Sequence, residues 1–165
     1  MDIETFSTAD LSDFYPDAQV CTLNLVQYGK TRRFFGPIRT VNFDGDLVVL
    51  GELLRQKVSG EILVVDANGR LDFALLGDRL ASSAIENGWS GVIINGAIRD
   101  VSILAKLNLG IKALGACPRR APLSGRISTP SSVTFGNTTF SSGDWLYSDD
   151  DGLIVSKHYL TLSAM

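Results

Sequence analysis

Residues 77–100 read Gly-Asp-Arg-Leu-Ala-Ser-Ser-Ala-Ile-Glu-Asn-Gly-Trp-Ser-Gly-Val-Ile-Ile-Asn-Gly-Ala-Ile-Arg-Asp, and this stretch organises the chain. Twenty residues separate Asp78 from the adjacent pair Arg99 and Asp100, which follows the apolar run at residues 92–94. In open α/β folds, ligands bind at the carboxyl ends of buried strands, so a guanidinium beside a carboxylate there is well placed for chemistry. The alternative is an exposed ion pair at the start of the next helix, which stabilises a protein little.

The beginning of this stretch has two interpretations. Residues 73–88 fit one helix by their apolar period, with Gly77 tolerated inside it. Alternatively, Gly77 breaks the pattern and the helix begins just after Asp78, which leaves unpaired amides up to Leu80 as an anion site. We favour the break. We also expect a turn at residues 95–96 to close the apolar run that precedes Arg99.

The rest of the chain alternates short helices and strands. Ser7 is the expected N-cap of the first helix, and the last expected helix packs through Ile103, Leu104 and Leu107. The expected helices are residues 7–13, 47–57 and 101–107. The expected strands are residues 20–26, 34–43, 61–66, 111–116, 133–135, 138–140, 145–147 and 153–155. Turns are expected at residues 29–33, between the first two strands, and at residues 67–69, after the third.

Two charged segments suggest binding sites, but each also has a simpler structural explanation. The loop at residues 117–129 carries Arg119, Arg120 and Arg126 without an acid, and such a loop is more often a solvated surface than a nucleic-acid site. The run Asp-Asp-Asp-Gly at residues 149–152 suggests a metal site. A hairpin turn between two strands is the commoner explanation for that run, and we favour it.

Composition narrows the function classes. The chain has 165 residues, of which 45% are hydrophobic and 20% charged, so we expect a single globular domain over residues 1–165. A net charge of −3 argues against nucleic-acid binding, including direct sequence-specific binding. Two distant cysteines and a lone histidine cannot assemble a zinc site. With no leader-like or membrane-length apolar segment, we expect a cytoplasmic protein without membrane association.

Several common catalytic motifs are missing from the sequence. It contains no P-loop, no Gly-x-Gly-x-x-Gly after a strand and no Gly-x-Ser-x-Gly elbow. His158 is the only histidine and lies near the end of the chain, so a Ser/His/Asp triad is not expected. Hydride transfer, P-loop phosphoryl transfer and serine hydrolysis are therefore disfavoured.

The order and spacing of several motifs resemble a known family. They are Asp78 with Arg99 and Asp100, Gly-Ile-Lys-Ala-Leu-Gly at 110–115, Pro-Arg-Arg at 118–120, Val-Thr-Phe-Gly at 133–136 and Tyr-Ser-Asp-Asp-Asp-Gly at 147–152. Over residues 7–157 the chain resembles the RraA-like family, which holds the regulator of ribonuclease E activity A and the class II 4-hydroxy-4-methyl-2-oxoglutarate aldolases. The resemblance implies an α/β fold of the β/β/α swivelling-domain type, with mixed sheets and short helices, and a homotrimer.

The resemblance also implies roles for individual residues. Enzymatic members cleave 2-oxo acids through a pyruvate enolate, as aldolases or oxaloacetate decarboxylases, with a divalent cation such as Mg²⁺ or Mn²⁺. It makes Asp100 the metal ligand and Arg99 a catalytic and substrate-binding residue. On chemical grounds, we expect Asp78 to orient a metal-bound water that takes the proton of the C4 hydroxyl of the substrate. The implied substrate-binding segment is Gly77, Asp78, Arg79 and Leu80.

Two departures favour a second, non-catalytic function. Ile103 stands where lyase members tend to carry an acid, and the chain ends at Met165 without the longer segment expected of some aldolases. The resemblance then implies a trimeric regulator that binds and inhibits ribonuclease E or its RNA helicase partner. The candidate contacts are Lys112, Arg119, Arg120 and Arg126. An inert scaffold with a vestigial site is a third alternative.

Overall fold

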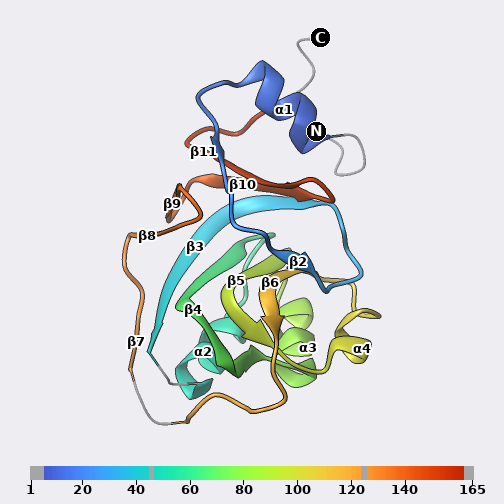
Figure 1. The fold of residues 1–165 in the computed structure, drawn as a ribbon, viewed down its shortest axis with the longest axis vertical. Coiled ribbons are helices and arrows are strands. Elements are labelled where there is room, and N and C mark those ends of the chain that lie inside the picture. The colour runs from blue at the N-terminus through green and yellow to red at the C-terminus, as the bar shows by residue number, and fades with distance from the viewer. Residues whose placement is uncertain (1–5, 45–46, 124–125, 162–165) are drawn as a thin grey trace.

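A set of parallel strands forms the centre of the protein in a computed structural model, which describes residues 6–44, 47–123 and 126–161 (Figure 1). The strands are β3 (Phe34–Asp44), β4 (Ile62–Leu76), β5 (Gly91–Ile98) and β6 (Gly110–Ala116). They lie side by side in chain order, β3 to β6, with every pair parallel. The short strand β2 (Val26–Gln27) adds antiparallel to the free edge of β6.

The long strand β3 joins this parallel set to an antiparallel one. Residues 34–37 pair with β10, and residues 38–42 pair with β4. Beyond β10, the order continues through β11 to β1, and β7 pairs with the end of β3. These strands are β10 (Trp145–Asp149), β11 (Gly152–Ser156), β1 (Gln19–Val20) and β7 (Arg126–Ser128).

Helices α2 (Leu47–Leu54), α3 (Asp78–Glu86) and α4 (Val101–Leu104) pack on one face of the parallel strands. Helix α2 buries Leu47, Leu50 and Leu54, which lie three or four residues apart on one side of the helix. Helix α3 buries only Ala81 and Ala84, whose small side chains let it lie close to the sheet. The strands beneath are apolar on both faces, as parallel strands covered on both sides require.

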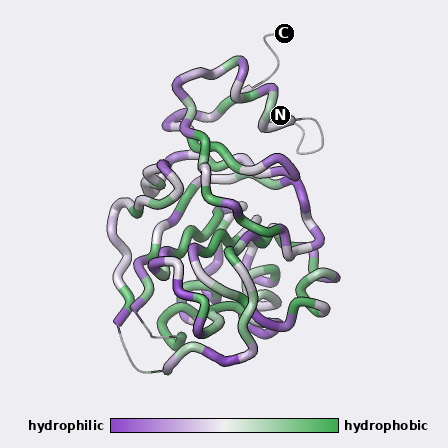
Figure 2. Tube along the Cα trace, viewed as in Figure 1, coloured by the Kyte–Doolittle hydropathy of each residue, from purple (hydrophilic) through white to green (hydrophobic). Residues whose placement is uncertain are grey.

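The opposite face is covered by the hairpin of β8 (Ser132–Phe135) and β9 (Thr138–Ser141). A third cluster lies where α1 (Thr8–Phe14) packs on β10 and β11, around Phe6 and Tyr147. Figure 2 shows that hydrophobic residues are concentrated along the strands at the centre of the molecule. Within the described ranges, no helix is both long and apolar enough to span a membrane.

Most of the expected elements are confirmed. Ser7 caps α1, its hydroxyl accepting from the Asp10 amide at 3.2 Å, and the break at Gly77 is correct because β4 ends at Leu76 and α3 begins at Asp78. Both hairpins in the C-terminal part are present. The mixed α/β architecture with short helices agrees with the predicted fold class.

Several boundaries were wrong. Residues 20–26 do not form one strand, because β1 pairs with β11 whereas β2 pairs with β6. Strand β5 continues through residues 95–96 to Ile98, since the Asn95 side-chain amide donates to Asp66 at 2.8 Å and satisfies a polar group inside the sheet. Strand β4 likewise continues beyond residues 67–69, where its register shifts. Ile103 is 46% exposed and does not pack α4 onto the sheet.

Candidate functional site

The pairing of β4 with β5 brings the two parts of the site together. Leu76 and Ile98 are register partners at the carboxyl ends of these parallel strands. The Arg99 amide donates to the Leu76 carbonyl oxygen at 2.9 Å, which extends the pairing by one residue. Gly77 therefore lies beside Arg99, although twenty-two positions separate them in the sequence. This is the carboxyl edge at which the sequence predicts a site.

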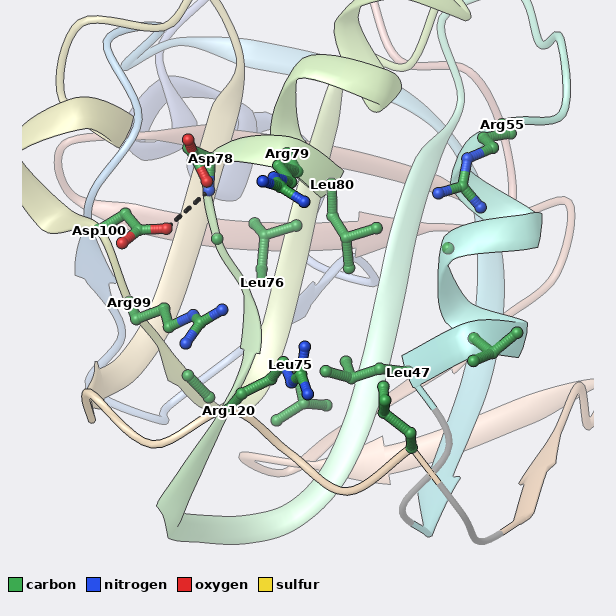
Figure 3. Close-up of a pocket in the computed structure, with 15 residues that line it drawn as sticks. Leu47, Arg55, Leu75, Leu76, Asp78, Arg79, Leu80, Arg99, Asp100 and Arg120 are labelled. Atoms are coloured by element: carbon green, nitrogen blue, oxygen red, sulfur yellow. Dashed lines mark hydrogen bonds between the residues drawn. The ribbon is translucent and has the colours of Figure 1, made fainter.

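Asp100 has an unusual backbone conformation that directs its side chain. Its φ of 62° and ψ of 39° are left-handed, a region that aspartate tolerates better than most residues. Its carbonyl oxygen accepts from the amides of Ile103 and Leu104, both at 2.9 Å, and so starts α4. Its carboxylate does not cap α4, and instead Oδ2 accepts from the Asp78 amide at 3.0 Å (Figure 3).

Gly77 permits this contact because it has no side chain. A Cβ at position 77 would lie 2.6 Å from Asp100 Oδ2 and 3.4 Å from Arg99 Cγ. Real Cβ atoms do not approach an oxygen that closely, so any larger residue would displace the carboxylate. The glycine thus fixes the distance between the start of α3 and Asp100.

The first turn of α3 retains amides for a ligand. The Asp78 amide is used by Asp100, and the Ala81 amide donates to the Gly77 carbonyl oxygen at 3.0 Å. In the part of the chain that the structure describes, the amides of Arg79 and Leu80 have no hydrogen-bond acceptor. Two adjacent free amides at a helix N-terminus favour a carboxylate or phosphate oxygen.

These groups open into a cavity of about 690 Å³. Figure 3 shows Asp78, Arg79, Arg99 and Asp100 along one side and Arg55 across from Asp100. The remaining lining is largely apolar and comes from Leu47, Val48, Gly51, Ala74, Leu75, Leu76, Gly77, Leu80 and Leu123, with Arg120 among them. Among the described residues, Arg99 and Asp100 form no ion pair with each other, so the alternative of a simple surface pair does not describe this site.

Sequence reasoning missed Arg55 and did not predict that Arg120 lines the cavity. Arg55 follows α2 and reaches the cavity only because α2 packs beside α3. Arg120 is exposed, so its role as a partner contact stays a prediction, and it also lines the cavity because its segment pairs with Ala74 of β4. No local motif marks either residue. Arg119 and Arg126 are exposed, as the prediction of a partner surface requires.

Lys112 was also predicted as a partner contact, and the structure corrects this. Its side chain is 3% exposed, and Nζ donates to the carbonyl oxygens of Asp149 at 2.5 Å and Gly152 at 3.3 Å. Burial lowers the pKa of the Lys112 ammonium, although the charge of Asp149 opposes that shift. Lys112 ties β6 to the β10–β11 hairpin and cannot reach a partner.

The surroundings of Asp100 fit a cation that takes only one ligand from the protein and the others from water and substrate. Within the described ranges, no cluster of three or more His, Cys, Asp or Glu residues could hold a metal, which includes the acidic hairpin turn. Asp100 Oδ2 has the Asp78 amide, while Oδ1 has no donor among the described residues. Mg²⁺ and Mn²⁺ bind through one or two carboxylates plus waters and substrate oxygens, which is the set that Asp100 can offer.

Comparisons with known proteins agree on one family. The family model described as RraA-like, Aldolase/RraA, matches residues 8–155. A Halorhodospira halophila protein named "Putative 4-hydroxy-4-methyl-2-oxoglutarate aldolase" is 45% identical over 160 residues, which cover 94% of this chain and 98% of that protein.

Two solved structures share the fold over nearly the whole chain. The first, a Geobacillus kaustophilus S-adenosylmethionine:2-dimethylmenaquinone methyltransferase, is 40% identical with a TM-score of 0.91, and the match covers 94% of this chain and 97% of that one. The RNA-processing inhibitor RraA from Thermus thermophilus is 32% identical, also with a TM-score of 0.91, over 96% of both chains.

Proposed function

This chain belongs to the RraA-like family, and from that premise we propose that it is a divalent-metal-dependent lyase that releases pyruvate from 2-oxo acids. The proposed reactions are cleavage of 4-hydroxy-4-methyl-2-oxoglutarate and decarboxylation of oxaloacetate. The observation that carries the proposal is the Asp100 carboxylate, which is held by the Asp78 amide beside Arg99 and faces a cavity of about 690 Å³.

In this proposal, the substrate is held at its 2-oxo acid end. The free amides of Arg79 and Leu80 and the guanidinium of Arg99 bind the C1 carboxylate and the 2-oxo oxygen. Asp100 would hold the cation, and when bound the cation supplies Lewis-acid stabilisation of negative charge on the 2-oxo oxygen. The fixed charge of Arg99 contributes to the same stabilisation.

Cleavage of the aldol substrate then needs one proton acceptor. The C3–C4 bond breaks with its electron pair left on C3, which gives the enolate of pyruvate, while the C4 hydroxyl loses its proton and becomes a carbonyl. Asp78 is half-buried at the start of α3 and accepts that proton, directly or through a water. Decarboxylation of oxaloacetate gives the same enolate and CO₂ without this proton transfer, so it depends less on Asp78.

The test is pyruvate release in MgCl₂ by the wild type and by Asp100→Asn, with the metal's own decarboxylation of oxaloacetate subtracted. Asparagine keeps the side-chain size and tolerates the left-handed backbone but has no charge. We expect activity to fall about 10³-fold. Asp150→Asn is the matched control, because Asp150 pairs with Arg32 on the surface at 2.7 Å. Equal rates for the wild type and Asp100→Asn would refute the lyase proposal.

Ile103 supports a second candidate function, a trimeric regulator that binds ribonuclease E or its helicase partner. This side chain is 46% exposed on α4, next to Asp100, at the position where the family resemblance implies an acid in lyases. The Thermus relative is an RNA-processing inhibitor. The contacts proposed here are the exposed Arg119 and Arg126. The combined change Arg119→Glu and Arg126→Glu should weaken binding to purified ribonuclease E, and unchanged binding would exclude this surface.

Assembly and location remain predictions that accompany either function. The homotrimer follows from the family resemblance, and light scattering of the purified protein at several concentrations would test it. We also propose a cytoplasmic location. Cell fractionation would test that prediction.

A further inference from the structure

Two arginines in the cavity have no role in the proposed chemistry. Arg55 lies across the cavity from Asp100, and Arg120 reaches into the same space from the segment after β6 (Figure 3). Neither guanidinium has a carboxylate partner in the described part of the chain. Other exposed arginines do pair, as Arg32 does with Asp150 and Arg70 with Asp72, each at 2.7 Å.

Arg120 is held in position by its own backbone. The Ala74 amide donates to the Arg119 carbonyl oxygen at 2.7 Å, and the Ala121 amide donates to the Ala74 carbonyl oxygen at 2.9 Å. This short bridge fixes residues 119–121 like a strand beside β4. Neighbouring side chains on such a segment point to opposite sides. Ala121 is 2% exposed in the core, and Arg120 therefore points outward into the cavity.

Arg55 is directed into the cavity by Gly51, one helical turn earlier. The Arg55 amide donates to the Gly51 carbonyl oxygen at 3.1 Å, which places both residues on one side of α2. A Cβ on Gly51 would lie 3.2 Å from Arg55 Nη1 and 3.2 Å from Leu80 Cδ2. The guanidinium thus lies over the glycine, in the gap between α2 and the first turn of α3.

The balance of charge around the cavity indicates what these two arginines bind. Among the residues that the structure describes, four arginines line it, Arg55, Arg79, Arg99 and Arg120, against two acids, Asp78 and Asp100. The C1 carboxylate of a 2-oxo acid is accounted for by Arg99 and the amides of α3. An arginine fork recognises a carboxylate through paired hydrogen bonds. We propose that Arg55 and Arg120 are specificity-determining residues that bind a second carboxylate, at the substrate end remote from the 2-oxo group.

This inference rests on the proposed function for the orientation of the substrate, and a binding experiment tests it without turnover. Calorimetry in MgCl₂ would compare 2-oxoglutarate with 2-oxopentanoate, which differs only by a methyl group in place of the second carboxylate. We expect the wild type to bind 2-oxoglutarate at least about tenfold more tightly. Arg55→Gln and Arg120→Gln should each reduce this preference severalfold, and the double variant should abolish it. Arg32→Gln, a surface control, should keep it.

The outcomes separate this inference from the lyase proposal. Equal affinities of the wild type for the two acids, or a preference that survives in the double variant, would overturn the inference. Pyruvate release from 4-hydroxy-2-oxoglutarate and 4-hydroxy-2-oxopentanoate is measured in parallel. Preferential binding that depends on Arg55 and Arg120, without any turnover, would uphold the inference and refute the lyase. Turnover of both substrates without a preference would overturn the inference and support the lyase proposal.

Discussion

Asp149 is the last residue of strand β10 and Asp100 lies two residues after strand β5, but their carboxylates have different surroundings. Asp149 is 7% exposed, and its oxygens accept from the Thr8 amide at 2.7 Å, the Thr8 hydroxyl at 2.6 Å and the Asp151 amide at 3.0 Å. Asp100 is half-buried and accepts only from the Asp78 amide among the described residues. The first carboxylate is occupied by its own chain, while the second keeps an oxygen for a ligand.

The positive charges near the acidic hairpin and around the cavity differ in the same way. Near the hairpin, Lys112 donates hydrogen bonds to two carbonyl oxygens, and Arg32 forms an ion pair with Asp150. Around the cavity, Arg99 and Arg120 have no acid partner in the described ranges. A cleft lined mainly by one sign of charge raises the local concentration of counter-ions, so this concentration of positive charge favours an anionic ligand. We infer from this comparison that the charged groups of the acidic hairpin stabilise the fold, whereas those of the cavity are available to a ligand.

The largest expected effect compares the two aspartates directly. Asp149→Asn removes the charge that the two Thr8 groups and the Asp151 amide bind, and it places an amide donor against donors. We expect the free energy of unfolding to fall by about 3 kcal/mol, whereas Asp100→Asn should lower it by less than about 1 kcal/mol. Urea unfolding followed by circular dichroism measures both variants. Similar losses of unfolding free energy in the two variants would show that the two aspartates do not differ in their contribution to stability.

Gly77→Ala should give the next largest effect, on activity rather than stability. The added Cβ would lie 2.6 Å from Asp100 Oδ2, so the carboxylate must move. We expect pyruvate release to fall about 100-fold, since small misplacements of catalytic groups have effects of that size. Gly115→Ala is the matched control, because its Cβ would make an ordinary contact of 3.5 Å with Leu71 Cδ2. Full activity in Gly77→Ala would show that the position of Asp100 is not critical.

Much of this contrast can be predicted from local sequence. Gly77 could be recognised as a helix boundary because glycine is unfavourable inside a helix and an acid, which favours the first turn, follows it. The hairpin turn at residues 149–152 could be recognised because Gly152 follows the acids between two apolar runs. Both features depend on residues close together in the chain. Local chemistry therefore predicts where the aspartates lie.

The partners of the charged residues could not be predicted in the same way. Lys112 is buried because its acceptors, 37 and 40 residues later, lie on another pair of strands. Arg120 reaches the cavity through a bridge to Ala74, and Arg55 through the packing of α2. A single sequence does not specify such long-range contacts. Whether a charge is used by the fold or left for a ligand is decided only in three dimensions.

Arginine substitutions test the same comparison for the positive charges, with Arg99 at the cavity and Arg32 near the hairpin. Arg99→Lys keeps the charge but loses the planar fork, so we expect about a 30-fold loss of pyruvate release. Arg32→Lys should change neither activity nor stability appreciably, because Arg32 and Asp150 are 62% and 63% exposed and such pairs contribute little. Steady-state kinetics and thermal unfolding measure both variants. Unchanged turnover in Arg99→Lys would remove Arg99 from the mechanism.

The smallest expected effect concerns the hydrogen bonds of the Asp149 carboxylate. Thr8→Val keeps the shape of the side chain and the amide that donates to Asp149 Oδ2, and removes only the hydroxyl that donates to Oδ1. A hydrogen bond to a charged group typically contributes about 1.5 kcal/mol, so we expect the free energy of unfolding to fall by about that amount. Thr134→Val, whose hydroxyl contact is exposed, should change it by less than about 0.5 kcal/mol. In a double-mutant cycle, the loss from Thr8→Val should shrink when Asp149 is already asparagine, because the two changes remove the same interaction. Additive losses would mean that Thr8 stabilises the fold independently of Asp149.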